Sequence, residues 1–317
     1  MITNRRQFAQ SIAAAICPSA LKAQAPTPNL WGGPVVDCHF HLRPSPESNV
    51  AHLDGCGVSN AVLLARENSV EQIRNLQTQY PGRFLGWFAS ADITNPDAEQ
   101  LLTNAVKNGA IGFGEIKFHV AADGPELRRA YALAADLNLP ILIHFQEVPH
   151  TSTEGVFSTG FRNFEVILKA YPKTRFIGHT DAFWANISAA YTNDVAYPTG
   201  EVMPGGVTDK LLSDYPNLFG DLSANSGNNG LSRDPEFTRG FLERHQDKLI
   251  FGSDCSCSDG HGGGISQANN PAASRLAGKC VARETLTLLQ KTVTPVQFRK
   301  MTWENAHRVY KLPPATA

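Results

Sequence analysis

Two histidines separated by one residue close the first apolar run of the chain, residues 35–42. Because side chains alternate along a strand, His39 and His41 would lie on one face, with Phe40 turned away. Their positions would be roughly 6.6 Å apart along the chain, so both imidazoles can converge on one divalent ion. An H-x-H pair alone is weak evidence, because such pairs also arise by chance.

Three later apolar runs end in residues of the same chemical kind. His144 follows residues 139–143, His179 follows residues 175–178, and Asp254 follows residues 249–253. Imidazole and carboxylate groups are ligands suited to zinc or another borderline divalent metal. Four strands that end in this way predict a metal centre where the strand ends meet.

A further run, residues 111–120, carries Glu115, Lys117 and His119 at alternating positions. In a strand these three side chains would share one face. They could contribute to the same centre. The alternative is an internal ion pair between Glu115 and Lys117 that braces the sheet.

These polar residues need a scaffold that brings strand ends together, and the order of the elements supplies one. Eight β-rich runs alternate with amphipathic segments, which predicts a single-domain α/β fold, the (β/α)8 TIM barrel. No G-x-G-x-x-G follows the first run, which disfavours an open dinucleotide-binding sheet. Ser69 and Gln72 form a capping-box pattern for one helix, and Asn95-Pro96 predicts the start of the next. The expected strands cover residues 35–42, 60–65, 83–89, 111–120, 140–145, 174–179, 218–222 and 249–252.

Two connections are too long to be plain turns, residues 180–209 after the sixth strand and residues 255–280 after the eighth. In a barrel, both would lie at the C-terminal ends of the strands, where active sites are built. The second connection contains Cys255 and Cys257 and ends at Cys280. These three cysteines could bind a metal, remain free thiols, or form one bridge, and we favour the bridge.

The N-terminus has the order of an export signal. Arg5 and Arg6 precede a modestly apolar segment, residues 12–21, and the small-residue site Ala23-Gln24-Ala25 follows. The arginine pair favours the twin-arginine route. We therefore expect a signal peptide over residues 1–25, a barrel domain over residues 26–317, and an exported protein, periplasmic or secreted, with no membrane anchor in its mature form.

Taken together, the motifs resemble those of the amidohydrolase superfamily. The segments are Val-Asp-Cys-His-Phe-His at 36–41, Pro-Ile-Leu-Ile-His at 140–144, Phe-Ile-Gly-His at 176–179 and Leu-Ile-Phe-Gly-Ser-Asp at 249–254. The chain is most similar to the amidohydrolase-related, or "amidohydrolase 2", branch, whose last helix the segment 305–310 also resembles. That branch includes lactone hydrolases and non-oxidative decarboxylases.

The resemblance implies roles for individual residues. His39, His41 and His144 would bind metal, and Asp254 would bind metal and exchange a proton with water. His179 would be a second-metal ligand or would orient water and polarise the substrate. Gly-Glu-Ile at 114–116 is similar to a metal-binding segment of TatD-type deoxyribonucleases, which favours Glu115 as a ligand, and Lys117 matches a substrate-facing cation of decarboxylase-like relatives.

The expected function is metal-dependent hydrolysis of a small-molecule ester, lactone, amide or related C–N bond. Two alternatives stay open: a non-oxidative decarboxylase or lyase acting on an unsaturated or aromatic carboxylic acid, and an inactive ligand-binding barrel. We expect one or two divalent ions, zinc first, with manganese or iron as alternatives. A net charge of −1 gives no basic footprint for nucleic acid. A homo-oligomer is compatible with the sequence.

Overall fold

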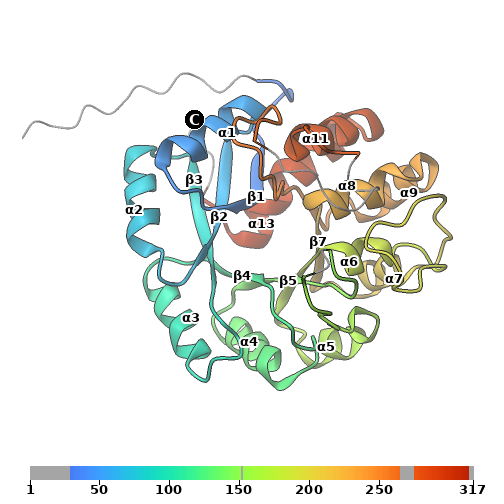
Figure 1. Ribbon diagram of the computed structural model, residues 1–317, viewed down its shortest axis with the longest axis horizontal. Coiled ribbons are helices and arrows are strands. Elements are labelled where there is room, and N and C mark those ends of the chain that lie inside the picture. The colour runs from blue at the N-terminus through green and yellow to red at the C-terminus, as the bar shows by residue number, and fades with distance from the viewer. Residues whose placement is uncertain (1–28, 151–152, 265–274, 314–317) are drawn as a thin grey trace, which may run out of the picture.

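Eight parallel strands form one sheet in sequence order and curl into a barrel, as predicted (Figure 1). The computed structural model describes residues 29–150, 153–264 and 275–313, so the expected signal peptide lies outside the described residues. A backbone hydrogen bond from Cys38 N to Phe251 O (3.0 Å) joins the last strand to the first. The strands are β1 (Val36–His41), β2 (Asn60–Arg66), β3 (Phe84–Ser90), β4 (Gly112–Ile116), β5 (Pro140–His144), β6 (Arg175–His179), β7 (Leu218–Asp221) and β8 (Leu249–Ile250).

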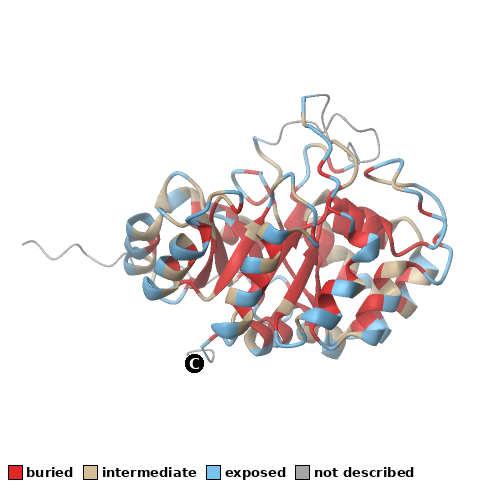
Figure 2. Ribbon diagram, turned by 90° about the horizontal axis from the view of Figure 1, so that it is seen from below, coloured by how far each residue is buried: buried red, intermediate tan, exposed pale blue. Residues whose placement is uncertain are grey.

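Helices surround the strands and turn their exposed residues outward (Figure 2). None of the helices in the described part of the chain is long and apolar enough to cross a membrane. They are α1 (Pro46–Cys56), α2 (Val70–Gln79), α3 (Ala98–Lys107), α4 (Pro125–Asp136), α5 (Glu165–Ala170), α6 (Asp181–Ala185), α7 (Val207–Asp214), α8 (Ala224–Ser232), α9 (Pro235–His245), α11 (Val281–Thr292), α12 (Pro295–Arg299) and α13 (Asn305–Tyr310), with a 3-10 turn at Phe161–Asn163 and a π turn at Lys300–Glu304.

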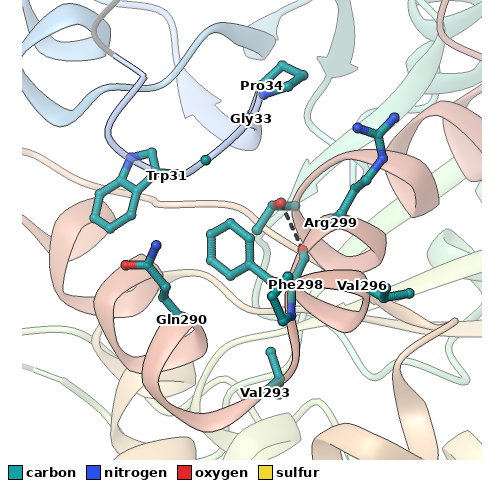
Figure 3. Close-up of a pocket in the computed structure, with 11 residues that line it drawn as sticks. Trp31, Gly33, Pro34, Gln290, Val293, Val296, Phe298 and Arg299 are labelled. Atoms are coloured by element: carbon teal, nitrogen blue, oxygen red, sulfur yellow. Dashed lines mark hydrogen bonds between the residues drawn. The ribbon is translucent and has the colours of Figure 1, made fainter.

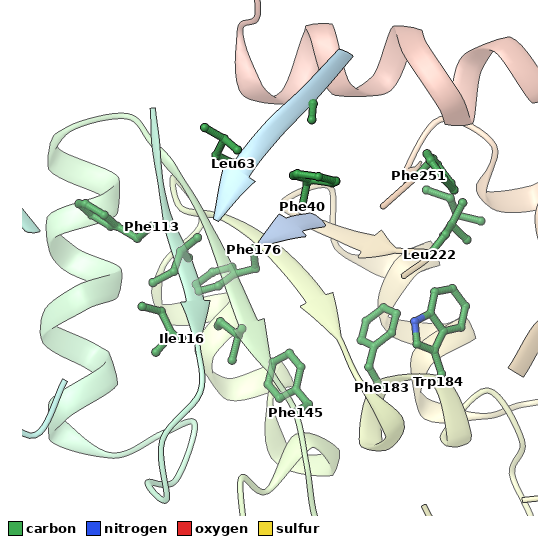
Figure 4. Packing of buried hydrophobic residues seen from close by; sticks show 14 of the residues in the cluster. Phe40, Leu63, Phe113, Ile116, Phe145, Phe176, Phe183, Trp184, Leu222 and Phe251 are labelled. Atoms are coloured by element: carbon green, nitrogen blue, oxygen red, sulfur yellow. The ribbon is translucent and has the colours of Figure 1, made fainter. Parts of the chain in front are cut away.

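The larger hydrophobic cluster packs the strands against the surrounding helices (Figure 4). It includes Phe40, Leu63, Phe113 and Phe176, one from each of four strands. Phe40 therefore points away from the side that carries the two histidines, as the alternation along β1 predicts.

A second apolar cluster takes residues from the other face of the strands. Leu142, Ile177 and Phe219 belong to it, and each stands two residues before a polar residue that ends the same strand. Because side chains two residues apart share a face, this cluster forms a dry layer directly under those polar strand ends. The layer fixes the strand ends and keeps water to one side of them.

Helix α2 starts where the pattern predicts, with Ser69 at its N-cap, but the predicted capping box is not formed, and the next predicted helix start is wrong. Ser69 makes no side-chain capping bond, and Gln72 donates instead to the backbone oxygen of Arg43 (3.0 Å). The next helix begins at Ala98 rather than at Pro96, because Asn95 accepts a hydrogen bond from Asp97 N (2.9 Å) in a turn that precedes it. In both places a local side-chain contact competes with the helix for the same groups.

Candidate metal centre and active site

Five side chains from four strand ends point into one small space at the C-terminal end of the barrel. His41 Nε2 lies 3.3 Å from Asp254 Oδ1 and 3.6 Å from Glu115 Oε2. His39 Nε2 lies 3.8 Å and 3.9 Å from the same two oxygens. His179 Nε2 lies 3.4 Å from Glu115 Oε1. Ligand atoms that share one divalent ion at about 2.1 Å are separated by about 3.0–3.5 Å. The contacts of His41 and His179 lie in or close to this range, and those of His39 exceed it by a few tenths of an ångström, so a small inward movement would bring the groups around one cation.

The clearest sign that a cation belongs there is the Nε2 atom of His39. His39 is fully buried, and this nitrogen has no hydrogen-bond partner among the described residues. A buried polar atom without a partner is costly, and a bound cation would satisfy it. Imidazole nitrogens and carboxylate oxygens also form the mixed donor set expected of zinc, manganese or iron. The residues therefore fit a divalent metal.

The charged groups of the centre shift the pKa values of its three histidines. Burial alone would lower the pKa of His39, but Asp221, Asp254 and Glu115 outweigh it and raise the pKa to about 9. The pKa of His41 rises to about 10, against the effect of burial, because of Asp254 and Glu115. Burial and the neighbouring His39 lower the pKa of His179 to about 3. Without a cation, two of these three imidazoles carry the positive charge that balances the carboxylates.

Asp221, at the end of β7, holds two of the histidines in place. Its Oδ2 lies 2.6 Å from His39 Nδ1 and 2.8 Å from Ser223 Oγ, and that hydroxyl lies 2.8 Å from His179 Nδ1. These contacts leave both Nε2 atoms free to face the centre. Asp221 is a site residue missed from the sequence, although its signal was there, since it also closes an apolar strand.

The absence of a side chain at Gly252 lets His39 and Asp221 lie close to the backbone after β8. A methyl group on Gly252 would lie 2.5 Å from His39 Cβ and 2.6 Å from Asp221 Oδ1. Asp254, two residues later, adopts a left-handed φ of 46° and donates its backbone N–H to His39 O (2.9 Å). Strained backbone of this kind persists where the surroundings fix it, often at functional sites.

His144 lies beside the centre with both ring nitrogens engaged. Nδ1 makes a short contact with Glu115 Oε1 and lies 2.9 Å from Thr180 Oγ1, and Nε2 lies 2.6 Å from Gln146 Oε1. Gln146 is oriented by its own amide, which donates to Glu154 (2.9 Å). His144 therefore positions Glu115 in this structure, while its assignment as a metal ligand stays a prediction.

The fourth strand is shorter than predicted, and this separates the three residues that were expected to share a face. β4 ends at Ile116, after Gly114, whose φ of 138° and close approach to Leu142 exclude a side chain. Glu115 enters the centre. Lys117 pairs with Glu154 (Nζ to Oε1, 3.5 Å) rather than with Glu115, and His119 stacks on Phe157 outside the barrel (ring centroids 3.8 Å apart). The ion pair between Glu115 and Lys117 was therefore the wrong alternative.

A polar cavity of about 260 Å³ opens next to the centre. Asp254, His144 and His179 form its floor, and its walls include Lys117, His150, Tyr197 and Asn225. His150 is held by Asp181, with 2.7 Å between Nε2 and Oδ1. His150 lies in the connection after β5 and Tyr197 in the connection after β6, where no periodic pattern distinguishes a site residue from a surface residue.

A larger cavity of about 440 Å³ lies between the segment before β1 and the connection from α11 to α12 (Figure 3). Trp31, Val293, Val296 and Phe298 give it a mostly apolar lining. None of the predicted site residues lines it, so we assign the chemistry to the smaller, polar cavity.

The disulfide expected among the three C-terminal cysteines is not formed. Cys255, Cys257 and Cys280 are free and buried. The Sγ atoms of Cys255 and Cys257 lie 3.3 Å apart, well beyond the roughly 2.05 Å of an S–S bond. Cys255 and Cys280 are 3.9 Å apart.

Replacing Asp221 with asparagine should weaken metal binding by about 10- to 100-fold, the usual effect of removing a carboxylate behind a ligating histidine. The variant keeps the shape of the side chain but loses the anionic acceptor for His39 Nδ1. Competition with a chelating dye would measure the affinity. Asp209→Asn is a matched control, because Asp209 forms a similar pair with His245 (2.6 Å) away from the centre. Equal affinities in the two variants would contradict the role of Asp221.

Solved structures with this fold include several enzymes. A probable 2-pyrone-4,6-dicarboxylic acid hydrolase from Acinetobacter baumannii, with citric acid bound, is 13% identical, with a TM-score of 0.55 over 88% of this chain and 100% of that one. A dihydroxybenzoic acid decarboxylase from a Polaromonas species, with manganese and 2-nitroresorcinol bound, is 13% identical, with a TM-score of 0.55 over 89% and 98%. A 5-carboxyvanillate decarboxylase from Sphingomonas paucimobilis is 9% identical, with a TM-score of 0.55 over 88% and 99%.

What these proteins share with the chain is the barrel. No family model and no curated protein matches the chain. At such low identities the likeness establishes the fold.

Proposed function

We propose that this protein is a metal-dependent hydrolase of the amidohydrolase superfamily that acts on a small, anionic ester or lactone. The observation that carries the proposal is the convergence of His39, His41, His179, Glu115 and Asp254 around the unpartnered Nε2 of His39. We infer one divalent ion, zinc first and manganese or iron next, because these five groups face a single space.

The five converging residues would hold the ion. A bound divalent cation would polarise a carbonyl group and lower the pKa of water. Asp254 lines the cavity and is ionised at neutral pH, since His39 and His41 outweigh the effect of burial and lower its pKa to about 2. Its carboxylate would accept a proton from the attacking water and return it to the leaving group. His179 would act as a ligand, because its Nε2 faces the carboxylates while its Nδ1 is held by Ser223.

The cavity indicates the kind of substrate. Lys117, His150 and Asn225 offer nitrogen donors around a space of about 260 Å³, which suits a small molecule that carries a carboxylate. Lys117 would stabilise negative charge that develops on the substrate.

Decarboxylation is the second candidate, favoured by the same observation. The carboxylate of an aromatic substrate would be held by Lys117 and His150 beside the metal. It could leave as carbon dioxide once the ring carbon that bears it takes up a proton. The three neighbours described above include enzymes named for each reaction.

A two-substrate assay separates the candidates. The purified protein, loaded with zinc or manganese, is incubated with 2-pyrone-4,6-dicarboxylate and with 2,6-dihydroxybenzoate, and products are followed by mass spectrometry. Ring opening with uptake of one water supports hydrolysis, and release of carbon dioxide supports decarboxylation. If neither compound reacts, a wider panel of esters, lactones and aromatic acids follows. If the metal-loaded protein turns over none of these compounds, the result would favour an inactive barrel that only binds a ligand.

Export by the twin-arginine route is part of the proposal and rests on the N-terminal residues alone. We expect the mature chain to begin at Pro26 and to be found outside the cytoplasm. Replacing Arg5 and Arg6 with lysine should hold the uncleaved chain in the cytoplasm. A variant exported normally would contradict the assignment.

A further inference from the structure

Three thiols and one imidazole meet outside the candidate active site. Cys255 and Cys257 lie in the segment directly after β8, Cys280 is the residue before α11, and His52 lies on α1. All four residues are buried, and their ligand atoms lie within 4.8 Å of one another. Segments more than 200 residues apart in the chain thus converge on one point. The cysteines are candidate metal ligands from the sequence alone, whereas His52 carries no sequence signal of such a role.

The spacing matches a tetrahedral metal site better than a disulfide. The Sγ atom of Cys255 lies 3.3 Å from that of Cys257 and 3.9 Å from that of Cys280, and Cys257 Sγ lies 3.4 Å from His52 Nδ1. Around a zinc ion, bond lengths of about 2.3 Å to sulfur and 2.0 Å to nitrogen separate neighbouring sulfurs by about 3.8 Å and sulfur from nitrogen by about 3.5 Å.

Polar contacts from two neighbouring elements hold the cysteine segment in place. The backbone N–H of Val281, in the first turn of α11, points to Cys255 Sγ at 3.3 Å. The guanidinium group of Arg43 donates to the backbone oxygens of Cys255 (2.8 Å) and Cys257 (2.7 Å). These contacts fix the backbone that carries Cys255 and Cys257 beside Cys280 and His52. Three sulfurs and one imidazole nitrogen held this close form a donor set suited to zinc.

We propose that His52, Cys255, Cys257 and Cys280 form a second, structural metal site that binds a zinc-type divalent cation. Four protein donors complete a tetrahedron and leave no open position, as in structural zinc sites. In the metal-free arrangement, His52 Nδ1 lies 3.0 Å from Cys257 O, a contact that it would exchange for the metal. The site would anchor the segment that carries Asp254 to α1 and α11.

The proposal does not depend on the proposed function, because the two centres differ in chemistry. The candidate active site has no thiolate, so cobalt bound there gives no sulfur-to-metal charge-transfer band. The second site has three. The charge-transfer band of cobalt(II) therefore reports on the second site alone.

The test is a cobalt titration of chelator-stripped, reduced, full-length protein under anaerobic conditions. We expect one equivalent to give an intense near-ultraviolet charge-transfer band with strong visible bands of tetrahedral cobalt. Cys280→Ala should lose most of the band. Cys38→Ala is the matched control, because Cys38 is equally buried but packs in the other hydrophobic cluster, and it should keep the band.

A measurement on the unmodified chain guards against variants that do not fold. Zinc-loaded protein is treated with an organomercurial, and the released zinc is counted with a colour indicator. The site is supported if one equivalent of zinc is released as the thiols react with the mercurial. It is supported further if the thiols are alkylated more slowly in the zinc-loaded protein than after zinc release. The absence of a charge-transfer band, thiols that react equally with and without zinc, or a native disulfide between two of the three cysteines in mass spectrometry would each overturn it.

Discussion

Replacing Asp254 with asparagine should lower kcat/KM by about 10³-fold on whichever substrate the two-substrate assay or wider panel identifies. The amide keeps the size of the side chain but cannot accept the proton from water, and a positioned general base contributes about 10²- to 10⁴-fold. The variant should also bind metal more weakly, because Asp254 Oδ1 lies 3.3 Å from His41 Nε2 at the centre. Steady-state kinetics at saturating metal would separate the loss of chemistry from the loss of metal.

Asp247→Asn is the matched control for this prediction. The Asp247 side chain is 67% exposed and pairs with Lys300 (2.9 Å), away from the cavity. This control should turn over substrate like the unmodified protein. If Asp254→Asn retained full activity with metal bound, Asp254 would have no part in proton transfer.

Metal affinity should rise about 100-fold per pH unit between about pH 7 and pH 8. The folded-state pKa values of His39 and His41, about 9 and about 10, lie above the ordinary 6.5, so both imidazoles are protonated in this window without metal. A cation must displace both protons, and two protons released per ion give this slope. His179, with a pKa of about 3, is already neutral and adds none.

The same pKa shifts give the metal-free protein a stability that depends on pH. Groups with raised pKa values stabilise the fold fully below about pH 6.5, and this contribution is lost as the pH rises through 9 to 10.

Calorimetric titration with manganese at pH 7.5, in two buffers of different ionisation enthalpy, counts the protons released when the metal binds. Manganese is chosen because thiolates bind it poorly. A count near zero would mean that the histidines do not bind the ion.

The barrel was predictable because its determinants are local. Apolar runs of strand length ending in His or Asp, separated by amphipathic helices, repeat along the chain, and strand ends of a parallel barrel meet at one face. For this reason the sequence placed His39, His41, His179 and Asp254 together before any contact was known.

Other features depend on contacts between distant segments. The end of β4 at Ile116 follows from the backbone of Gly114 against Leu142, which alternation alone does not encode. Asp221 acquires its role only when the barrel closes and brings β7 to within one strand of β1. His52 stands on a helix that showed no site motif, and it reaches the cysteines only because α1 packs against the segment after β8.

The central claim is a divalent cation at the strand ends, and elemental analysis of protein purified without chelator tests it most directly. The unmodified chain is compared with a His39→Ala/His41→Ala variant that circular dichroism shows to be folded. We predict that the variant loses at least one equivalent of metal. Any metal bound at the proposed second site, formed by the three cysteines and His52, should remain. Equal metal content in the two proteins, or an unmodified chain that takes up no ion at this centre when zinc or manganese is added, would contradict the account.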